Sequence, residues 1–281
     1  MDIHQYPHVI AGAFFRMQKK HILQLDEINK LVNGEVLFLD VFPHDESTRW
    51  LLSSSERQQL LKQLGARYYL EVSSEKWPFV ARQIRKKQNH RIGFYQGPYM
   101  LEGLDQDGIN AKSARKFLSS LLRYKTNFNW YKKLGYMYPV SGKVAYGNQI
   151  GRQLGYPTAN LDTDEPRKII PPMGVYAGWV KHDKKWYRSM INVGIRPTLN
   201  MDNVTIEAHI FDFSKDIYEQ EISIHFYKHI REEMKFPSLS KLTHQLSMDR
   251  GKALKTLEEA EITPWNHSDF IIPGLKPTLK E

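Results

Sequence analysis

The stretch from Gly142 to Asn160 constrains this chain more than any other, and it reads GKVAYGNQIGRQLGYPTAN. Glycines stand in it among basic, polar and β-forming residues, at positions 142, 147, 151 and 155. Because glycine accepts positive φ angles and lets backbones approach closely, such a loop can turn its N–H groups towards a phosphate. Neither the GxGxxG dinucleotide pattern nor the GxxxxGKS/T pattern is present, which excludes the two commonest phosphate-binding loops.

The stretch ends on a more specific segment, Pro-Thr-Ala-Asn at residues 157–160. Pro157 fixes its own φ and pushes Tyr156 towards an extended backbone, so the segment is stiff. It can therefore present the hydroxyl of Thr158 and the amide of Asn160 in a fixed arrangement. Hydroxyl and amide oxygens are hard neutral ligands, suited to Mg²⁺ that substrate phosphates also hold.

Four sequence blocks in the second half of the chain occur in the order that one known enzyme family has. They are GRQLGYPTAN ending at Asn160, GVYA from Gly174, NVGIRPT from Asn192 and TIEAHIFDF from Thr205. Together they resemble the riboflavin kinase domain of bacterial bifunctional riboflavin kinase/FMN adenylyltransferases, over roughly residues 135 to 260. The resemblance implies an enzyme that transfers a phosphoryl group from Mg-ATP to riboflavin and makes FMN.

The resemblance also implies roles for individual residues. Glu207 aligns with the glutamate assigned as the family's catalytic base, and Thr158 and Asn160 take the metal and phosphate positions. The other implied positions are the ATP-binding residues Gly151, Arg152, Gly155, Tyr156, Pro157 and Thr158, and the flavin-binding residues Asn192, Arg196 and Phe236. Simpler interpretations exist for some of them, since the glycines can be plain β-turn residues and Phe236 can be the hydrophobic anchor of the helix that follows it.

Glu207 lies in a strand-like segment, Val204-Thr-Ile-Glu-Ala-His-Ile210, in which successive side chains point to opposite faces. We expect this lone acid among apolar neighbours to be held rigidly at the mouth of a barrel. Without the resemblance, an exposed position on the polar face of a strand is the simpler interpretation. His209 falls on the same strand face, where it could orient Glu207, although a structural histidine is again the simpler interpretation.

Composition limits the class of protein. A chain of 281 residues corresponds to one large domain or two modest ones. It has no cysteine, which excludes disulfides and thiolate metal sites and favours an intracellular location. The apolar run at residues 9–15 is too short to span a bilayer and lacks the flanks of a leader, so we expect a cytoplasmic protein with no membrane contact. Its formal net charge of +9 comes from scattered Lys and Arg, which favours a solvated surface over a nucleic-acid site.

The first half alternates apolar runs with helical segments. This pattern predicts a parallel sheet with helices on its faces, in a Rossmann-like α/β domain over residues 1–130. The expected strands are residues 7–14, 36–42, 67–72 and 90–95, and the expected helices are residues 21–29, 54–65, 77–88 and 113–122. Such a domain binds its ligand at the carboxyl ends of its strands, so the loop after the first strand is the expected site.

That loop departs from the motif of the resembled family, GxFDGxHxGH, whose histidines and glycines contact ATP phosphates. Here it reads GAFFRMQKKH from Gly12 to His21, with Gln18 in place of the first histidine, and Arg115 is the retained arginine of a second degenerate block. Loss of one preorganised donor to a transition-state anion typically costs ~3–4 kcal/mol. We therefore expect this half to keep the adenylyltransferase-type fold without efficient FMN adenylyl transfer, although its basic residues could still attract a nucleotide.

The second half is rich in short β-forming segments separated by glycine, proline and asparagine. The expected strands are residues 140–146, 175–181, 185–192, 204–209 and 221–230. This spacing predicts a small antiparallel barrel, and the resemblance implies six strands in a Greek-key arrangement. A helix is expected from Ser238 to Glu259, with one face formed by Leu239, Leu242, Leu246, Leu254 and Leu257. Barrel and helix together make a second domain over residues 131–281.

These observations predict a riboflavin kinase that uses riboflavin, ATP and Mg²⁺, with FMN adenylyltransferase (FAD synthetase) activity weak or lost. The close alternative is a fully bifunctional enzyme. An alternative of a different class is a non-catalytic regulator that binds flavin, and a third is a nucleic-acid-binding barrel. The intact Thr158, Asn160 and Glu207 argue against a regulator, because a sensor needs no metal ligand beside a base. Nothing in the sequence indicates an oligomeric state.

Overall fold

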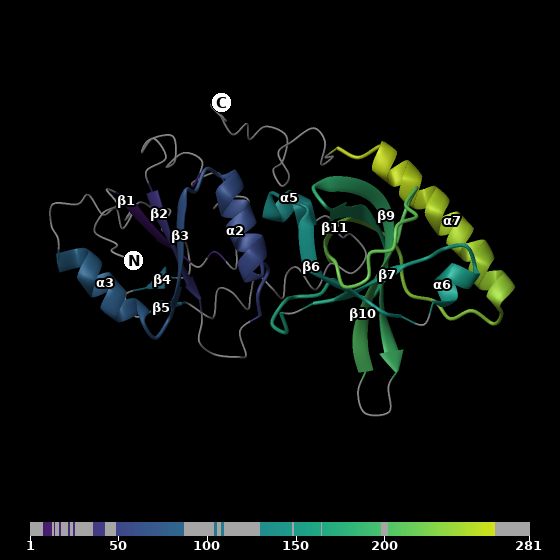
Figure 1. Ribbon diagram of the computed structural model, residues 1–281, viewed down its shortest axis with the longest axis horizontal. Helices are drawn as coiled ribbons and strands as arrows, with labels where there is room; N and C mark the ends of the chain where they lie inside the picture. The colour runs from purple at the N-terminus through teal and green to yellow at the C-terminus, as the bar shows by residue number, and fades with distance from the viewer. Residues whose placement is uncertain are drawn as a thin grey trace.

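A computed structural model describes residues 8–12, 14, 17, 22, 25, 36–42, 49–86, 104–105, 108–109, 130–147, 149–163, 165–197 and 202–261. Over these residues a small α/β half, in purple and blue, lies beside a six-stranded barrel in teal and green (Figure 1). A long helix, in yellow, lies along the barrel on the side away from the α/β half (Figure 1).

The α/β half is built on a parallel sheet with the strand order β1-β2-β3. Its strands are β1 (His8–Gly12), β2 (Val36–Phe42) and β3 (Tyr68–Ser73), and its helices are α2 (Ser54–Gln63) and α3 (Trp77–Lys86). The Ser53 hydroxyl accepts the N–H of Glu56, and the Glu56 carboxylate accepts the N–H of Ser53, which fixes the start of α2. The short pair β4 (Leu104–Asp105) and β5 (Gly108–Ile109) completes the described part.

Six antiparallel strands close the barrel in the order β10-β7-β6-β11-β8-β9. They are β6 (Tyr138–Ala145), β7 (Ala159–Asp162), β8 (Gly174–His182), β9 (Lys185–Pro197), β10 (Asp202–Ile210) and β11 (Glu221–Arg231). Alternate residues such as Ile206, Ala208 and Ile224 fill the interior with apolar side chains. Since side chains alternate along a strand, the residues between them face outward from the barrel wall.

Helix α7 (Leu239–Glu258) packs on the outer wall formed by β8, β9 and β11. The Ser238 hydroxyl caps it by accepting the N–H of Lys241 at 3.3 Å. Ala253 and Leu257 belong to an apolar cluster that also contains the outward-facing Trp179 of β8. Leu239 is 61% exposed, so the expected leucine face is not buried along its whole length. The buried residues of α7 all lie in its second half.

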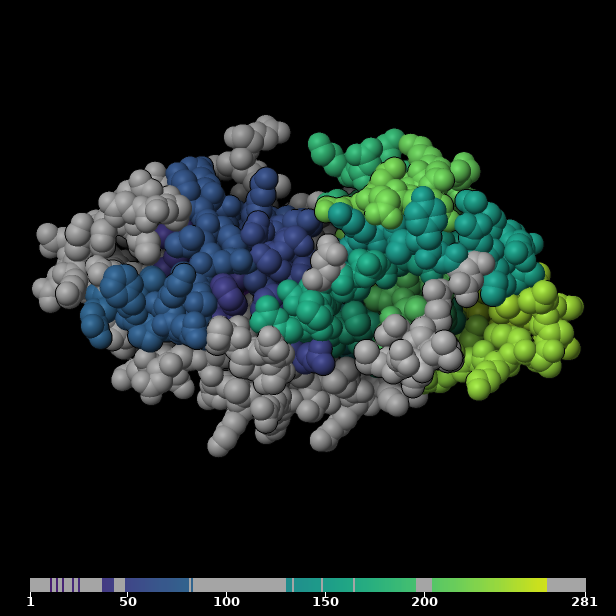
Figure 2. Space-filling view, turned by 60° about the horizontal axis from the view of Figure 1, so that its bottom comes forward, coloured from purple at the N-terminus to yellow at the C-terminus, as the bar shows by residue number. Residues whose placement is uncertain are grey.

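The two halves share one hydrophobic core. Leu51 and Leu60 from the α/β half belong to the same cluster as Tyr138 and Val140 of β6. The space-filling view shows residues 49–86, in blue, lying directly against the teal part of the barrel (Figure 2). Apolar packing therefore continues across the boundary predicted at residue 130.

A buried ion pair crosses the same junction. Lys168 Nζ lies 2.5 Å from Glu56 Oε2, and both side chains are at most 2% exposed. Glu56 Oε1 accepts the N–H of Ser141 on β6 at 3.0 Å, and Lys168 Nζ also donates to the carbonyl of Leu51. Helix α2 thus holds the barrel with the same carboxylate that caps its own first turn.

The structure confirms most of the expected elements. Strand 36–42 has the expected bounds, and the other described strands and helices differ from them by a few residues. Strand β7 and the short helices α5 (Trp130–Leu134) and α6 (Ile150–Gln153) were not expected, because four or five residues are too few to display a periodic pattern. The expected strand at 90–95, the helix at 113–122 and most of the helix at 21–29 lie outside the described residues.

Within the part of the chain that the structure describes, no helix combines the length and the apolar character needed to cross a membrane.

Candidate active site

Three polar side chains form a row across the outer face of three neighbouring strands. Glu207 of β10 pairs with Asn160 of β7 on one side and with Asn192 of β9 on the other. Their neighbours Ile206 and Val193 point into the barrel core, so the row faces outward. Glu207 therefore stands on the outer wall and not at the expected barrel mouth, because strand alternation turns it away from the packed interior.

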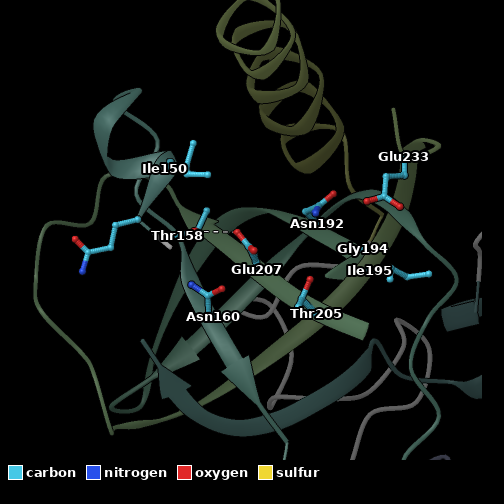
Figure 3. A pocket seen from close by; sticks show the side chains of 11 residues that line it. Ile150, Thr158, Asn160, Asn192, Gly194, Ile195, Thr205, Glu207 and Glu233 are labelled. Carbon is cyan, nitrogen blue, oxygen red and sulfur yellow. Dashed lines mark hydrogen bonds between the residues drawn. The ribbon is translucent and has the colours of Figure 1, made fainter. Parts of the chain in front are cut away.

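The row belongs to a pocket that encloses about 240 Å³ (Figure 3). The Thr158 hydroxyl donates a hydrogen bond to Glu207 Oε2 at 3.2 Å, drawn as a dashed line in Figure 3. The predicted site residues that line this pocket are Gly151, Thr158, Asn160, Asn192 and Glu207. The fold thus brings these predicted residues, which span positions 151 to 207 of the sequence, together in one pocket.

Helix α6 forms one wall of the pocket, in the stretch where we expected a glycine-rich loop. Gly155 follows it with φ 82°, in the left-handed region that glycine adopts without strain, and turns the chain back towards Pro157. Arg152 is exposed, and the ring of Tyr156 packs edge-on against His209 with 5.3 Å between centroids. These residues shape the approach to Thr158 without lining the pocket themselves.

The opposite end of the pocket uses residues that the motifs did not single out. Thr205 of β10 and Gly194 of β9 pair in the next row, and Glu233 lines the pocket beside them (Figure 3). A Cβ atom at position 194 would lie 2.7 Å from Glu233 Oε1, so any other residue there would require the Glu233 carboxylate to shift. The strand period could have identified Thr205, two residues before Glu207, whereas Glu233 comes from an irregular segment that carries no periodic signal.

Of the predicted flavin residues, Asn192 is the one that lines the pocket. The backbone of Arg196 in β9 pairs with Asn203 of β10, and the side chain of Arg196 lies outside the described residues. Phe236 packs under the guanidinium of Arg231, 5.7 Å from its carbon. This contact favours the anchoring role for Phe236, next to the start of α7.

Arg231 also ties the end of β11 to helix α7. Its guanidinium donates to both carboxylate oxygens of Asp249, with N–O distances between 2.8 and 3.1 Å, and Asp249 is fully buried. Gln245 donates to the same carboxylate at 2.8 Å. The pair therefore ties the end of β11, which directly precedes the segment that carries Glu233, to helix α7.

His209 lies on the same outward face as Glu207, and its partner is the backbone of the 157–160 segment. Burial lowers the pKa of His209 and Arg250 lowers it further, while the hydrogen bond to the Pro157 carbonyl opposes the shift. The ring is therefore neutral near pH 7. Its contact with Pro157 favours a structural histidine, the simpler of the two interpretations, over a histidine that orients Glu207.

The donor set around Thr158 fits Mg²⁺. The Thr158 hydroxyl donates a hydrogen bond to Glu207 and keeps its oxygen lone pairs for a metal ion, and Asn160 offers a neutral amide oxygen. Oxygen donors of this kind suit a magnesium ion that keeps waters and substrate phosphates as its other ligands. Among the described residues there is no group of three or more His, Cys, Asp and Glu side chains that could hold a metal ion.

In the α/β half, the carboxyl ends of the parallel strands hold a buried ion network where we predicted a degenerate adenylyltransferase site. Asp40 of β2 accepts the N–H of Phe14 at 3.1 Å, and Arg57 of α2 binds both Asp40 and Glu71. Burial raises the pKa of Asp40, and Arg57 opposes that shift. Gly12 ends β1 and pairs with Asp40, while Gln18, His21 and Arg115 lie outside the described residues.

Comparison with known proteins gives matches over the barrel half. Residues 134–257 match the Flavokinase family, described as riboflavin kinase. Similar proteins include the bifunctional riboflavin kinase/FMN adenylyltransferases of Bacillus subtilis (36% identical over 125 residues), Haemophilus influenzae (40% over 117) and Escherichia coli K12 (36% over 117). These alignments cover 41–43% of this chain and 37–39% of each relative, so the chain spans about two fifths of the relatives it matches.

A solved structure is similar over both halves. It is the crystal structure of a macrolide-efflux protein from Streptococcus pneumoniae, with a TM-score of 0.65 and 22% identity over 88% of this chain and 93% of that chain. At this identity the similarity concerns the fold alone. The closed barrel, the row of polar residues on its outer wall and the family match lie in the same part of the chain, and residues 134–257 are similar to the riboflavin kinase domains of the Flavokinase family.

Proposed function

We propose that this chain is a riboflavin kinase, which transfers the γ-phosphoryl group of Mg-ATP to the primary ribityl hydroxyl of riboflavin and yields FMN and ADP. The observation that carries the proposal is the meeting of Thr158, Asn160 and Glu207 in one pocket of the matched domain. Three relatives that are similar over this domain are named as riboflavin kinases, which supports the same substrates here.

In this proposal Glu207 takes the proton from the ribityl hydroxyl. The hydrogen bond from Thr158 holds the carboxylate in one orientation, and a general base in this position typically contributes ~10²–10⁴ in rate. Thr158 and Asn160 would hold Mg²⁺, which when bound neutralises charge on the transferred phosphoryl group. Thr158 directly precedes β7 and Asn160 is the second residue of that strand, so the two lie close together in the chain.

The remaining residues divide the pocket between the two substrates. Gly151 and helix α6 form the side next to Thr158, and we assign that side to ATP, with Arg152, Gly155, Tyr156 and Pro157 shaping it. Asn192, Thr205 and Glu233 form the other side, which we assign to riboflavin. Glu207 lies between the two sides, where the hydroxyl and the phosphoryl group must meet.

We further propose that residues 1–130 form a Rossmann-like domain of the adenylyltransferase type in which FMN adenylyl transfer is weak or lost. The degenerate loop from Gly12 to His21 supports this, and so does the ion network of Asp40, Arg57 and Glu71. A fully bifunctional enzyme is the second candidate, favoured by the names of the relatives, whose alignments cover about two fifths of their length.

The test is a time course with the full chain, riboflavin, ATP and Mg²⁺, in which riboflavin, FMN and FAD are separated by chromatography. FMN that accumulates without FAD supports both parts of the proposal. FAD that follows FMN supports the bifunctional alternative. Tight riboflavin binding without any FMN would replace the kinase by a flavin-binding regulator.

A further inference from the structure

We infer that His209 is a positioning residue for the nucleotide: it holds the Pro157-Thr158 peptide on strand β10, and so keeps Thr158 against Glu207. The inference rests on the proposed kinase function and assigns to His209 a role on the ATP side of the pocket alone.

The central contact joins His209 Nδ1 to the Pro157 carbonyl oxygen at 2.8 Å. A carbonyl oxygen only accepts hydrogen bonds, so Nδ1 must carry the ring proton. This carbonyl belongs to the peptide whose nitrogen is that of Thr158. Two side chains on one face of β10 therefore bond to consecutive residues: His209 to the carbonyl of Pro157, and Glu207 to the hydroxyl of Thr158.

The contact begins where the backbone ladder ends. Pairing between β10 and β7 runs from Ile206 opposite Leu161 to Ala208 opposite Ala159. The next residue of β10 is His209, and the next residue of the facing segment is Thr158. One position beyond the last backbone pair, a side-chain hydrogen bond from the imidazole thus takes the place of backbone pairing. Thr158 is therefore held by β7 on its C-terminal side and by the Pro157 contact on its N-terminal side.

Packing fixes the imidazole in this orientation. His209 is 9% exposed, and its ring meets Tyr156 and Phe211 edge-on, with centroid distances of 5.3 and 5.5 Å. The charged group that faces this cluster is Arg250 of α7, whose guanidinium carbon lies 5.4 Å from the Phe211 ring centroid. Because packing already restricts the His209 ring, little further side-chain entropy is lost at His209 when a ligand binds.

Loss of this bond should act on one substrate only. Without it the Thr158 hydroxyl can leave the position in which it meets the nucleotide phosphates and Mg²⁺, whereas Asn192, Thr205 and Glu233 keep theirs. Loss of the hydrogen bond at the part-buried Pro157 carbonyl, together with a loosened ligand, corresponds to about a tenfold loss of affinity.

The experiment uses the full chain with His209→Asn, His209→Gln and His209→Phe. The amide nitrogen of Asn stands where Nδ1 stands and can replace its donor, the amide of Gln reaches too far, and Phe keeps the ring without a donor. Steady-state KM values for Mg-ATP and riboflavin are measured, together with the Kd of Mg-ATP by calorimetry in the absence of riboflavin. The same substitutions at His244, an exposed residue of α7, serve as controls.

We expect His209→Phe to raise KM and Kd for Mg-ATP by about tenfold while KM for riboflavin changes much less, and His209→Asn to restore both nucleotide values. Equal changes in the two KM values, or an Asn variant as weak as the Phe variant, would overturn the inference. If the Phe variant does not fold, the contrast between Asn and Gln decides. If the wild-type chain makes no FMN, the kinase proposal fails, and the calorimetric contrast still decides the role of His209. A wild-type chain that does not bind Mg-ATP overturns both.

Discussion

Asp40 in VLFLDVF of β2 and Glu207 in VTIEAHI of β10 are both acids with mainly apolar neighbours along the strand. Asp40 is fully buried, and its oxygens accept from the Phe14 amide, the Arg57 guanidinium and the Tyr69 hydroxyl. Glu207 is half-buried, accepts from Thr158 and borders a pocket. The same local pattern therefore serves internal stability in one half and faces a ligand site in the other.

The difference comes from what each strand packs against. Both faces of β2 are covered, since Leu37, Leu39 and Val41 lie in one apolar cluster and Phe38 lies in another. Strand β10 has one face in the barrel core, while the other face borders the pocket. A polar residue becomes available for chemistry only where the fold leaves its side of the strand accessible.

The largest expected effect concerns Glu207. Glu207→Gln removes the proposed base and keeps the shape of the side chain, so we expect the rate of FMN formation to fall by ~10²–10⁴ with little change in melting temperature. The rate is measured by chromatography at saturating substrates. Glu221→Gln, an exposed strand residue of β11, is the matched control. A variant that keeps more than a tenth of the wild-type rate would remove Glu207 from the mechanism.

The corresponding change in the α/β half is Asp40→Asn. It removes one of the two carboxylates that bind the buried Arg57 guanidinium and leaves Glu71 as the other, and we expect a loss of about 3–5 kcal/mol in the free energy of unfolding. Because Asp40 belongs to no part of the kinase pocket, kcat should stay close to that of the wild type under conditions where the variant is folded. Urea unfolding gives the first quantity, with Asp162→Asn on the surface as the control. Lost activity in a fully folded variant would contradict this division of roles.

A smaller effect is expected at Asp249, a buried acid of the barrel half that lies behind the pocket. Asp249→Asn weakens the pair with Arg231, so the segment that carries Glu233 becomes less well held. We expect KM for riboflavin to rise about tenfold and KM for Mg-ATP to change less, which corresponds to about 1.4 kcal/mol of binding free energy. Asp216→Asn is the exposed control. A shift in the Mg-ATP value alone would show that our assignment of the two sides is reversed.

The last expected effect is a pH dependence of stability that comes from a buried histidine of the barrel half. His225 of β11 is fully buried, and burial, helped by Lys181 and by Lys168 at the junction, lowers its pKa from 6.5 to about 3. An unfolded chain binds this proton near pH 6.5, and the folded protein binds it only near pH 3. Stability should therefore rise with pH between these values, by up to about 1.4 kcal/mol per pH unit from this group.

Urea unfolding between pH 5 and pH 7 measures this slope. Replacing His225 by Gln removes the titrating group, so the slope should decrease by this amount even if the variant is less stable throughout. Identical slopes in the wild type and the variant would mean that His225 is protonated in the folded protein or keeps its proton affinity on unfolding.

Much of the fold could be predicted because its signals are local. The continuous apolar run of residues 36–42 gave strand β2 its bounds, and Ser238 correctly marked the start of α7. The ligand-facing residues of the barrel were predictable only as motif positions. Their meeting depends on strand register, which pairs Glu207 with Asn160 and Asn192, and no single segment contains that information.

Other features depend on contacts between segments distant in the sequence. Glu233 reaches the pocket because Arg231 is bound to α7, and Arg57 meets Asp40 because α2 packs on the sheet. The lone acid in VLFLDVF was a signal that could have been used, since a carboxylate in a fully apolar strand requires a buried partner. The partner itself could not be deduced, because several arginines of the first half were equally available.

The outward direction of the Glu207 row has a consequence for how this domain can change over time. Even-numbered positions of β10, such as 206 and 208, lie in the apolar interior, while positions 205 and 207 line the pocket and position 209 bonds to the Pro157 carbonyl. Residues that form the core and residues that form the outer pocket thus alternate along the same strand. Substitutions at the outward-facing positions can therefore change the pocket while the barrel interior stays the same. The row of polar residues can also be lost without loss of the barrel fold.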